Sequence, residues 1–470
     1  MLAPLRKQIF RVSVYMSSKL NVVILAAGKG TRMRSETPKV LHELAGLSLV
    51  EHVITTARSL KPDNITLVVG HRAEEIETHL ADKGLNFVLQ EEQKGTAHAV
   101  EQALPFLNAD AKVLILYGDV PLTTKESLQK LLDLCNEKTM AVLTSEVKNP
   151  NGLGRILRDP AGNIKAIVEE KDANDIEKLL TEINTGIMVF PVKKLKQWLP
   201  NINNNNTQNE YYLTDIVGLA LADECQVKTS TCTDEHEAYG VNDLLQLANL
   251  EKIYQKQKAS EFMLNGVAIV DASRFDVRGN AEISAGVKID INVILEGKVS
   301  IQKNVKIGAN CILKNCTIAE GTEIFPNTII EDAEIGKDCK VGPFARLRPG
   351  TELKDHAKIG NFVETKKALI GKESKVNHLS YIGDSDLGEG VNIGAGTITC
   401  NYDGVNKFKT EIGKNVFIGS NSALVAPLKI ADGATIGAGS TITKDVNADQ
   451  LALTRVQQSN IDGWKRPSKK

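Results

Sequence analysis

Aliphatic side chains recur at every sixth position through much of the second half of the chain. The repeat covers residues 283–446 and begins with Ile283, Ile289, Leu295, Ile301, Ile307 and Leu313. A six-residue period is neither the 3.6-residue period of an α-helix nor the two-residue period of an ordinary strand. It predicts a triangular solenoid in which each hexad forms one flat side, a small residue occupies each corner, and the aliphatic side chains stack inward.

Three hexads make one coil of the predicted solenoid, so residues 283–446 should hold about nine coils, stacked to a length of roughly 40 Å. The period is interrupted near 365–369 and again by an insertion at 399–411. Insertions between repeats tend to form loops on a binding face. A binding loop at 399–411 is therefore expected, and a tolerated surface loop is the alternative.

The first half alternates short apolar runs with segments of helical periodicity. The spacing predicts strands over 21–26, 64–69, 85–89 and 112–116 and a helix over 40–60. This alternation is typical of an α/β domain with a mostly parallel sheet, on which ligands bind beyond the carboxyl ends of the strands. Binding residues are therefore expected in the segments 26–39, 90–96 and 117–121. A further helical spacing over 243–266 predicts a linker helix between the halves.

Composition narrows the class of protein. A length of 470 residues implies two or three domains. The 57 basic and 58 acidic residues leave no net positive charge for a nucleic acid or an acidic membrane, and no apolar run is long enough to span a bilayer. Seven cysteines without a C-x-x-C pair argue against disulfides and zinc, and favour the cytoplasm.

The N-terminus begins with a basic segment that lacks acidic residues. Met16 stands just before the first apolar run. We expect translation to start at Met16 and residues 1–16 to form a disordered extension.

A glycine loop with two cations follows the first predicted strand. Gly28 and Gly30 permit close approach of the backbone to a phosphate, and Arg32 and Lys39 suit a polyphosphate. The loop is neither a P-loop nor a dinucleotide fingerprint, and a ligand-free turn is the alternative. Asp119 ends another strand, where it is a candidate Mg²⁺ ligand or a helix cap.

Three polar side chains of the solenoid half suggest chemistry on an amine. Arg348 and Lys366 lie one coil apart and should stack, whereas His378 lies twelve residues beyond Lys366, on another side of the prism. The cations would hold an anionic sugar phosphate while His378 acts as a general base. A merely solvated histidine is the alternative.

The motifs of the first half resemble, in order, those of sugar-1-phosphate nucleotidyltransferases. They are Leu25-Ala-Ala-Gly-Lys-Gly-Thr-Arg-Met with Pro38-Lys39, Gln93-Lys-Gly95-Thr96, Tyr117-Gly-Asp119, Gly154-Arg155, Val168-Glu169, Asn184-Thr-Gly186 and Glu210-Tyr-Tyr-Leu-Thr-Asp215. The second half resembles hexapeptide-repeat left-handed β-helices, which commonly form trimers. With the Asn401-Tyr-Asp loop, residues 17–470 resemble the bacterial bifunctional N-acetylglucosamine-1-phosphate uridyltransferase/glucosamine-1-phosphate N-acetyltransferase family.

The resemblance implies a Rossmann-like uridyltransferase domain over 17–243, a linker helix over 244–266 and a left-handed β-helix acetyltransferase domain with a C-terminal tail over 267–470. It implies acetylation of glucosamine 1-phosphate by acetyl-CoA, followed by coupling to UTP with Mg²⁺, in a cytoplasmic homotrimer that supplies peptidoglycan and lipopolysaccharide precursors. No nucleic-acid or membrane partner is implied.

The resemblance also implies roles for single residues. The uridine nucleotide and its sugar would contact Leu25, Ala26, Ala27, Gly28, Lys39, Gln90, Gly95, Thr96, Tyr117, Gly118, Asp119, Gly154, Glu169, Asn184 and Asn242. Asp119 and Asn242 would hold Mg²⁺, although a turn role for Asn242 is the alternative from spacing. Arg32 and Lys39 would offset phosphate charge. The amino-sugar phosphate would contact Arg348, Lys366, Tyr381 and Asn392, with His378 as base and Glu364 orienting it. Acetyl-CoA would contact Ala395, Asn401, Tyr402, Ser420, Ala438 and Arg455.

Two other classes of function stay open at this point. One is a single-activity nucleotidyltransferase whose solenoid serves assembly or regulation. The other is a noncatalytic scaffold that binds nucleotide sugars. Assays of thiol release and of pyrophosphate release discriminate among the three.

Overall fold

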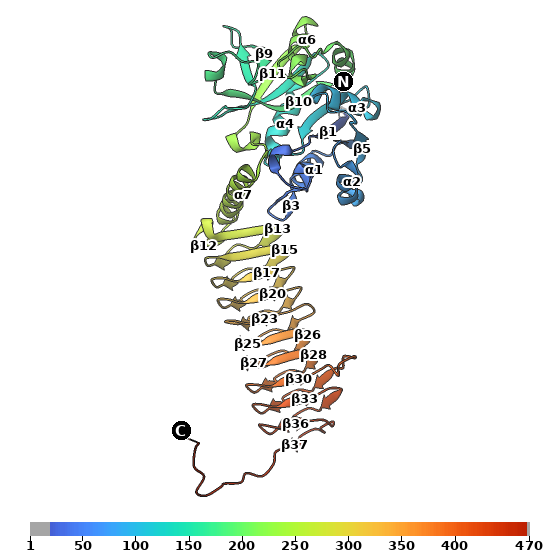
Figure 1. Ribbon diagram of the computed structural model, residues 1–470. Coiled ribbons are helices and arrows are strands. Elements are labelled where there is room, and N and C mark those ends of the chain that lie inside the picture. Colours follow the sequence, from blue (N-terminus) through green and yellow to red (C-terminus); the bar gives the residue numbers. More distant parts are fainter. Residues whose placement is uncertain (1–18, 468–470) are drawn as a thin grey trace, which may run out of the picture. The chain divides into compact units, whose positions relative to one another are not determined.

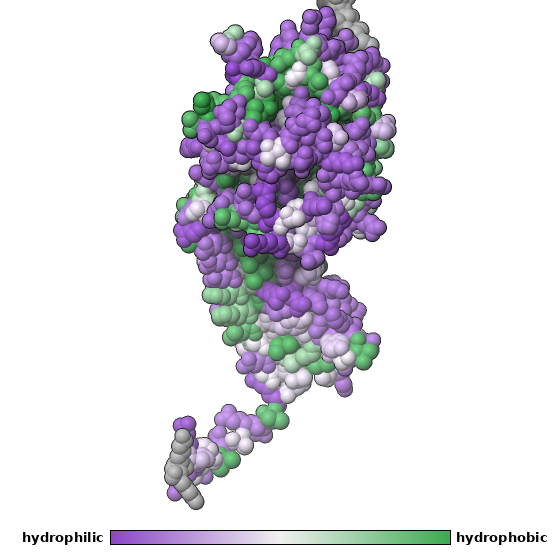
Figure 2. Space-filling view, turned by 45° about the horizontal axis from the view of Figure 1, so that its top comes forward, coloured by the Kyte–Doolittle hydropathy of each residue, from purple (hydrophilic) through white to green (hydrophobic). Residues whose placement is uncertain are grey.

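The computed structural model describes residues 19–467, and these form two compact units that divide between Leu250 and Glu251 (Figure 1). The expected disordered extension over 1–16 lies outside the described residues. In residues 19–467 no helix is both long enough and apolar enough to cross a membrane. The face of the first unit seen in Figure 2 is predominantly hydrophilic, with apolar residues in scattered patches.

The first unit is built on a nine-stranded mixed sheet with the central order β11-β7-β10-β6-β1-β4-β5. Its strands are β1 (Leu20–Ala26), β4 (Asn64–Val69), β5 (Asn86–Leu89), β6 (Lys112–Tyr117), β7 (Thr139–Glu146), β8 (Arg155–Arg158), β9 (Ile164–Val168), β10 (Glu182–Pro191) and β11 (Gln226–Thr231). Strand β1 pairs in parallel with β4 and β6, as predicted, whereas β10 runs antiparallel between β6 and β7. Strands β8 and β9 form a hairpin beside β10.

Helices cover both faces of this sheet because the central strand is apolar on both sides. Val22 and Ile24 belong to one buried cluster, and Val23 and Leu25 belong to another. Such a continuous apolar run is the mark of a strand buried on both faces. The helices are α1 (Leu49–Ser59), α2 (Ala73–His79), α3 (Thr96–Ala103), α4 (Lys125–Leu134), α5 (Val192–Trp198) and α6 (Ile216–Ala222).

The helix predicted over 40–60 is wrong in its first part. A short hairpin of β2 (Glu43–Leu44) and β3 (Leu47–Ser48) precedes α1, with Ala45 at φ +51° and Gly46 at φ +78° in the turn. The helix starts only after Ser48, which forms a capping box with Glu51. This Ser-x-x-Glu spacing is the local signal that sets the true start.

The second unit is a solenoid of stacked parallel strands on three sides. One side is an eleven-stranded sheet of β12 (Ala268–Ile269), β14 (Lys288–Ile289), β16 (Lys306–Ile307), β19 (Glu323–Ile324), β22 (Lys340–Val341), β25 (Lys358–Asn361), β27 (Lys375–His378), β29 (Asn392–Ile393), β32 (Phe417–Ile418), β35 (Thr435–Ile436) and β37 (Leu451–Ala452). Nine of these strands, from β14 to β35, fall within 283–446, one for each of the nine coils expected there. Strands β12 and β37 extend the stack at its two ends.

The other two sides share a fifteen-stranded sheet, because four long strands bend around a corner. The long strands are β13 (Phe275–Ile283), β15 (Val293–Ile301), β26 (Glu364–Ile370) and β28 (Tyr381–Leu387). The short ones are β17 (Ile312–Lys314), β18 (Thr317–Ile318), β20 (Ile329–Glu331), β21 (Glu334–Ile335), β23 (Arg346–Leu347), β24 (Glu352–Leu353), β30 (Ile398–Cys400), β31 (Thr410–Ile412), β33 (Ala423–Val425), β34 (Leu428–Ile430) and β36 (Thr441–Ile442).

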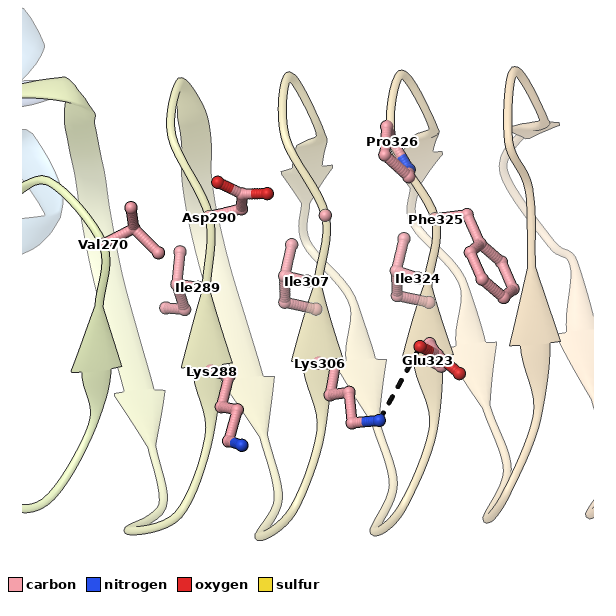
Figure 3. Close-up of a pocket in the computed structure, with 11 residues that line it drawn as sticks. Val270, Lys288, Ile289, Asp290, Lys306, Ile307, Glu323, Ile324, Phe325 and Pro326 are labelled. Atoms are coloured by element: carbon pink, nitrogen blue, oxygen red, sulfur yellow. Dashed lines mark ion pairs between the residues drawn. The ribbon is translucent and has the colours of Figure 1, made fainter.

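Equivalent side chains of successive coils stand directly over one another. Ile289 is in register with Ile307, and Ile307 with Ile324, so the aliphatic residues form one buried column (Figure 3). The neighbouring outward positions form a column of their own, in which Lys306 and Glu323 approach to 3.8 Å. The residues that recur with the predicted six-residue period therefore form an inward-facing column on each side of the prism.

One corner departs from the prediction that corners carry small residues. Phe344, Phe362 and Leu379 lie there at φ +54°, +55° and +49°, each more than half exposed. The rings of Phe344 and Phe362 stack with centroids 5.5 Å apart. Asn310 and Asn327 share this left-handed conformation, which is unfavourable for bulky side chains. Mutual stacking of the rings partly offsets that cost.

Helix α7 (Leu244–Leu264) closes the first coil of the prism. Gln255, which is buried, accepts a hydrogen bond from the Val277 N–H at 2.8 Å and donates one to the Val277 carbonyl at 2.9 Å. Its side-chain amide thus replaces the neighbouring strand that this edge lacks. Buried backbone groups without a partner would cost free energy comparable to a lost hydrogen bond.

Replacing Gln255 by Ala should lower the free energy of unfolding of the solenoid by about 1–3 kcal/mol, because both Val277 groups lose their partner. Urea denaturation followed by circular dichroism measures the loss. The exposed Lys256, the next residue of the helix, provides the control: Lys256→Ala should change little. Equal effects of the two substitutions would contradict the proposed role of the Gln255 amide.

Candidate active sites

A cavity of about 460 Å³ opens at the carboxyl ends of β1 and β6 in the first unit. The predicted nucleotide contacts that line it are Leu25, Ala26, Ala27, Gly28, Lys39, Gln90, Gly95, Thr96, Tyr117 and Asp119. The cavity therefore lies where ligands bind on open α/β sheets.

Gln93 and Glu210 also line this cavity, although they were not predicted as contacts. The segment around Glu210 reaches the cavity because the Tyr211 N–H donates to the Lys94 carbonyl at 2.8 Å. Gly95 permits this approach: it has φ +120°, and a Cβ there would lie 2.5 Å from the Tyr211 carbonyl oxygen. Gln93 and Glu210 both belong to motifs on which the family resemblance rests, so these motifs could have identified them as contacts.

Two cations and two side-chain oxygens meet beside Lys39 and Asp119, which line the cavity. The Lys39 ammonium pairs with the Asp119 carboxylate and donates to Asn242 Oδ1 at 3.3 Å. Arg32 donates to the same Asn242 oxygen at 2.9 Å. The Val241 N–H bonds to the Asp119 carbonyl at 3.0 Å, so the backbone itself holds Asn242 beside Asp119. Sequence spacing alone did not bring these residues together.

The predicted sugar contacts gather around Glu169. A Cβ at Gly154 would lie 3.3 Å from the Glu169 carboxylate, and the Asn184 N–H donates to the Gly154 carbonyl at 2.8 Å. Burial raises the pKa of Glu169, although the Thr214 hydroxyl donates to its carboxylate at 3.1 Å. These three residues therefore form one polar group whose carboxylate is shielded from water.

Tyr117 ends β6, two residues before Asp119, and lines the same cavity. Burial, and then the carboxylates of Glu169 and Asp119, raise the pKa of its hydroxyl well above the usual range. Gly186, at φ +82°, leaves space for the ring, since a Cβ there would lie 2.5 Å from Tyr117 Cε2. The neutral phenol thus occupies a fixed position at the wall of the cavity.

In the second unit, backbone hydrogen bonds order one column of residues at the end of the eleven-stranded side. From one coil to the next, the column contains Asn361, His378, Ala395, Ser420 and Ala438. The backbone carbonyl of each of the first four accepts a hydrogen bond from the N–H of the residue that comes directly after the next column member. The side chain of Arg455 packs beside Gly437 and Gly439 at the foot of this column. His378 and the predicted acetyl-CoA residues Ala395, Ser420, Ala438 and Arg455 are thereby aligned, with Asn392 on the same side.

The predicted sugar-phosphate cations lie on a different side of the prism. Arg348 precedes Lys366 by one coil, and its N–H donates to the Thr365 carbonyl at 2.9 Å. Lys366 is in register with Gly383, over which the Tyr381 hydroxyl lies. The nearby ammonium of Lys407, from the 399–411 insertion, lowers the pKa of Lys366, and desolvation and the Arg348 charge act in the same direction. Lys407 was not predicted, because no repeat register applies inside the insertion.

The expectation that Glu364 orients His378 is wrong within this chain. Glu364 accepts from Arg348 at 2.7 Å, whereas His378 Nδ1 lies 3.2 Å from Asn361 Oδ1. The physical reason is the register, which places Glu364 in the same column as Tyr381 and His378 in the column of Asn361.

The insertion forms a compact turn rather than an open loop. Tyr402 pairs with Lys407 as an isolated antiparallel bridge, and Asp403 accepts from the Val405 N–H at 2.8 Å. Asn401 is buried and donates to the Asp384 carboxylate, whereas Tyr402 is 58% exposed. Asn401 therefore anchors the turn, and the Tyr402 ring is available at its surface.

Family models match three parts of the chain. Residues 22–183 match a MobA-like NTP transferase domain, residues 277–354 a GMPPB C-terminal domain and residues 409–444 six bacterial transferase hexapeptide repeats. A relative from Marinobacter nauticus, named "Bifunctional protein GlmU", is 52% identical over 96% of this chain and 100% of its own length. The chain belongs to the GlmU family of bifunctional proteins.

A second GlmU relative, from Cellvibrio japonicus, is 56% identical over 96% of this chain and 100% of its own length. Membership of the GlmU family confirms the prediction of a transferase that joins a nucleotidyltransferase half to a hexapeptide acyltransferase half in the two-step synthesis of UDP-N-acetylglucosamine. A solved structure described as a nucleotidyl transferase from Methanothermobacter thermautotroptrophicus matches with a TM-score of 0.38 at 16% identity, covering 51% of this chain and 99% of that one.

No group of three or more His, Cys, Asp or Glu side chains gathers as a metal site in the part of the chain that the structure describes. The predicted Mg²⁺ ligands Asp119 and Asn242 do not form such a group, because they are only two residues and one of them is an amide.

Glu169 should make the stability of the first unit depend on pH. Its pKa is raised in the folded state, so its contribution is fully present below the unfolded pKa and is lost as the pH rises through the folded value. Glu169→Gln should therefore be more stable than the parent chain at pH 7 and equal to it near pH 4. Urea midpoints at both pH values measure this, with the exposed Glu137→Gln as control. A difference independent of pH would contradict the expectation.

Proposed function

We propose that the prism unit transfers the acetyl group of acetyl-CoA to the amine of glucosamine 1-phosphate, and that the cavity of the first unit then couples the product to UTP. The observation that supports this assignment is the grouping of predicted residues within each unit. Ten of the predicted nucleotide contacts line a single cavity, and the predicted acetyl-CoA residues Ala395, Ser420, Ala438 and Arg455 follow the column of His378.

In the uridylyl step, a phosphate oxygen of N-acetylglucosamine 1-phosphate attacks the α-phosphorus of UTP, and diphosphate leaves with the bonding electron pair. The attacking oxygen is already anionic, so no general base is required. Catalysis rests on positioning and on offsetting charge. Arg32 and Lys39 supply the cations, Gly28 exposes its backbone to the phosphates, and Glu169 with Asn184 holds the sugar.

We infer that Asp119 and Asn242 hold Mg²⁺ in this step. A carboxylate and an amide oxygen are hard ligands that suit this ion, and Lys39 already bridges these two side chains, which indicates a place for positive charge between them. When bound, Mg²⁺ supplies neutralisation of phosphate charge.

In the acetyl step, the amine must be neutral to attack the thioester carbonyl. Asn361 Oδ1 accepts from His378 Nδ1–H, which leaves Nε2 with the lone pair that takes the amine proton. The C–N bond forms, the C–S bond breaks, and CoA leaves as the thiolate. Arg348, Lys366 and Tyr381 bind the sugar phosphate, with Lys407 adding a further cation.

We propose that the prism winds to the left and assembles as a homotrimer in the cytoplasm. Two observations support assembly. His378 and the phosphate-binding cations lie on different sides of one prism, so a neighbouring prism would complete the site. The exposed apolar corner of Phe344, Phe362 and Leu379 adjoins the column of His378, and it suits contact with a second copy.

Replacing His378 by Ala should lower acetyl transfer by about 10²–10⁴-fold, because the amine loses its proton acceptor. Release of CoA thiol from acetyl-CoA and glucosamine 1-phosphate measures this step. Uridylyl transfer by the same protein should stay within about twofold. His356→Asn, at an exposed histidine of the same prism, is the control. Loss of both activities in the His378 variant would mean a structural role.

Replacing Asp119 by Ala should lower uridylyl transfer by on the order of 10³-fold, because a ligand for the phosphate-neutralising cation is removed. Pyrophosphate release from UTP and N-acetylglucosamine 1-phosphate measures the change, and thiol release should be unaffected. Asp110→Ala, which removes an exposed carboxylate paired with Lys193, is the matched control. Retained Mg²⁺-dependent uridylyl transfer in the Asp119 variant would reject the assignment.

A further inference from the structure

The first unit contains a fully buried guanidinium at Arg155, the first residue of β8. Its Nη1 lies 2.7 Å from Glu170 Oε2 and also donates to the Leu153 carbonyl, and its Nη2 donates to the Lys178 carbonyl at 3.4 Å. Removing a cation from water costs several kcal/mol, and an apolar side chain of similar volume is often at least as stable at such a position. Stability alone therefore gives a poor account of Arg155.

The place of this ion pair suggests a more specific role. Arg155 directly follows Gly154 along the chain, and Glu170 directly follows Glu169. Arg155 is also in register with Val168, across the β8–β9 hairpin. The ion pair thus joins the two chain segments that carry the proposed sugar contacts, at a point one residue from each contact.

The distances show that the positions of these sugar contacts leave little room for movement. Gly154 lies so close to the Glu169 carboxylate that a Cβ on it would be 3.3 Å from Oε2. Gly154 also accepts the hydrogen bond from the Asn184 N–H at 2.8 Å. A small shift of β8 relative to Glu170 would therefore change the separation of Gly154 from the Glu169 carboxylate and strain its hydrogen bond with Asn184.

We propose that the Arg155–Glu170 pair positions the sugar-binding residues Gly154 and Glu169 for the uridylyl step. The pair itself touches no substrate. Arg155 fixes the β8–β9 hairpin by forming an ion pair with the Glu170 carboxylate while it donates hydrogen bonds to the carbonyls of Leu153 and Lys178, a combination that suits a planar fork of several donors. This inference rests on the proposed function of the first unit.

The same strand offers a matched control. Arg158 forms a bidentate pair with Glu182, at 2.7 and 2.6 Å, near the other end of β8. Its side chain is about one-third exposed, whereas that of Arg155 is fully buried. Both pairs join β8 to another segment of the first unit, but only Arg155 lies next to a proposed sugar contact.

The experiment uses the full chain and measures uridylyl transfer while UTP and N-acetylglucosamine 1-phosphate are varied separately. Arg155→Met should raise the KM for the sugar phosphate by roughly 10–100-fold and leave the KM for UTP within about twofold. Glu170→Gln should act in the same direction, and Arg155→Lys should fall between Arg155→Met and the parent. Arg158→Met should leave both KM values unchanged.

Acetyl transfer, measured as thiol release, reports the amount of active prism unit in every variant because it occurs in the other unit, and circular dichroism reports whether the first unit is folded. An unchanged KM for the sugar phosphate in folded Arg155→Met would overturn the inference, as would a parallel loss for both substrates. If Arg155→Met does not fold, Arg155→Lys and Glu170→Gln decide by the same two criteria. Absence of uridylyl transfer in the parent chain would instead reject the proposed function.

Discussion

The backbone hydrogen bonds between successive coils are the constraint on which the second unit depends. They set most rungs 17 or 18 residues apart in register, as the asparagine ladder from Asn292 through Asn310 to Asn327 illustrates. Because the register is fixed, a side chain inside the stack has a neighbour above and below it from the same position of another coil. The interior column of aliphatic residues, the corner of exposed rings and the column of His378 are three results of this one rule.

The first unit organises its site by close approach rather than by repetition. Gly95 and Gly186 sit where any side chain would collide with Tyr211 or with the Tyr117 ring. These contacts bring segments that are distant in sequence to one cavity. Burial then sets the electrostatics, since it keeps Tyr117 and Glu169 shielded from water while Lys39 and Asp119 stay paired at the open edge.

Much of this architecture was predictable from the sequence because both halves carry strong periodic signals. The parallel strands around β1 and the nine coils within 283–446 follow from apolar runs and from the six-residue period. The start of α1 was missed because helical spacing over 40–60 hid the turn at Ala45 and Gly46. The bulky corner residues Phe344, Phe362 and Leu379 were missed because their stability depends on stacking between coils, which a linear pattern does not contain.

Candidate site residues could be named from the sequence, but their pairing could not. The motifs contain Arg32, Lys39 and Asp119, and the family resemblance added Asn242, yet their mutual hydrogen bonds depend on tertiary structure. Glu364 illustrates the limit, since only the register shows that it faces Arg348 and not His378. Lys407 had no signal, because it lies in an aperiodic insertion. Arg155 stood in a recognised motif, but its positioning role depends on its burial and on Glu170, which the motif does not show.

The amide of Gln255 has a consequence for assembly. A stack of parallel strands presents free N–H and C=O groups at its first rung, and such an edge can recruit a strand from another molecule. Gln255 occupies the N–H and the C=O of Val277, so these two groups of the first rung are already satisfied from within the chain. Helix α7 thereby makes this part of the prism a poorer template for end-to-end polymerisation.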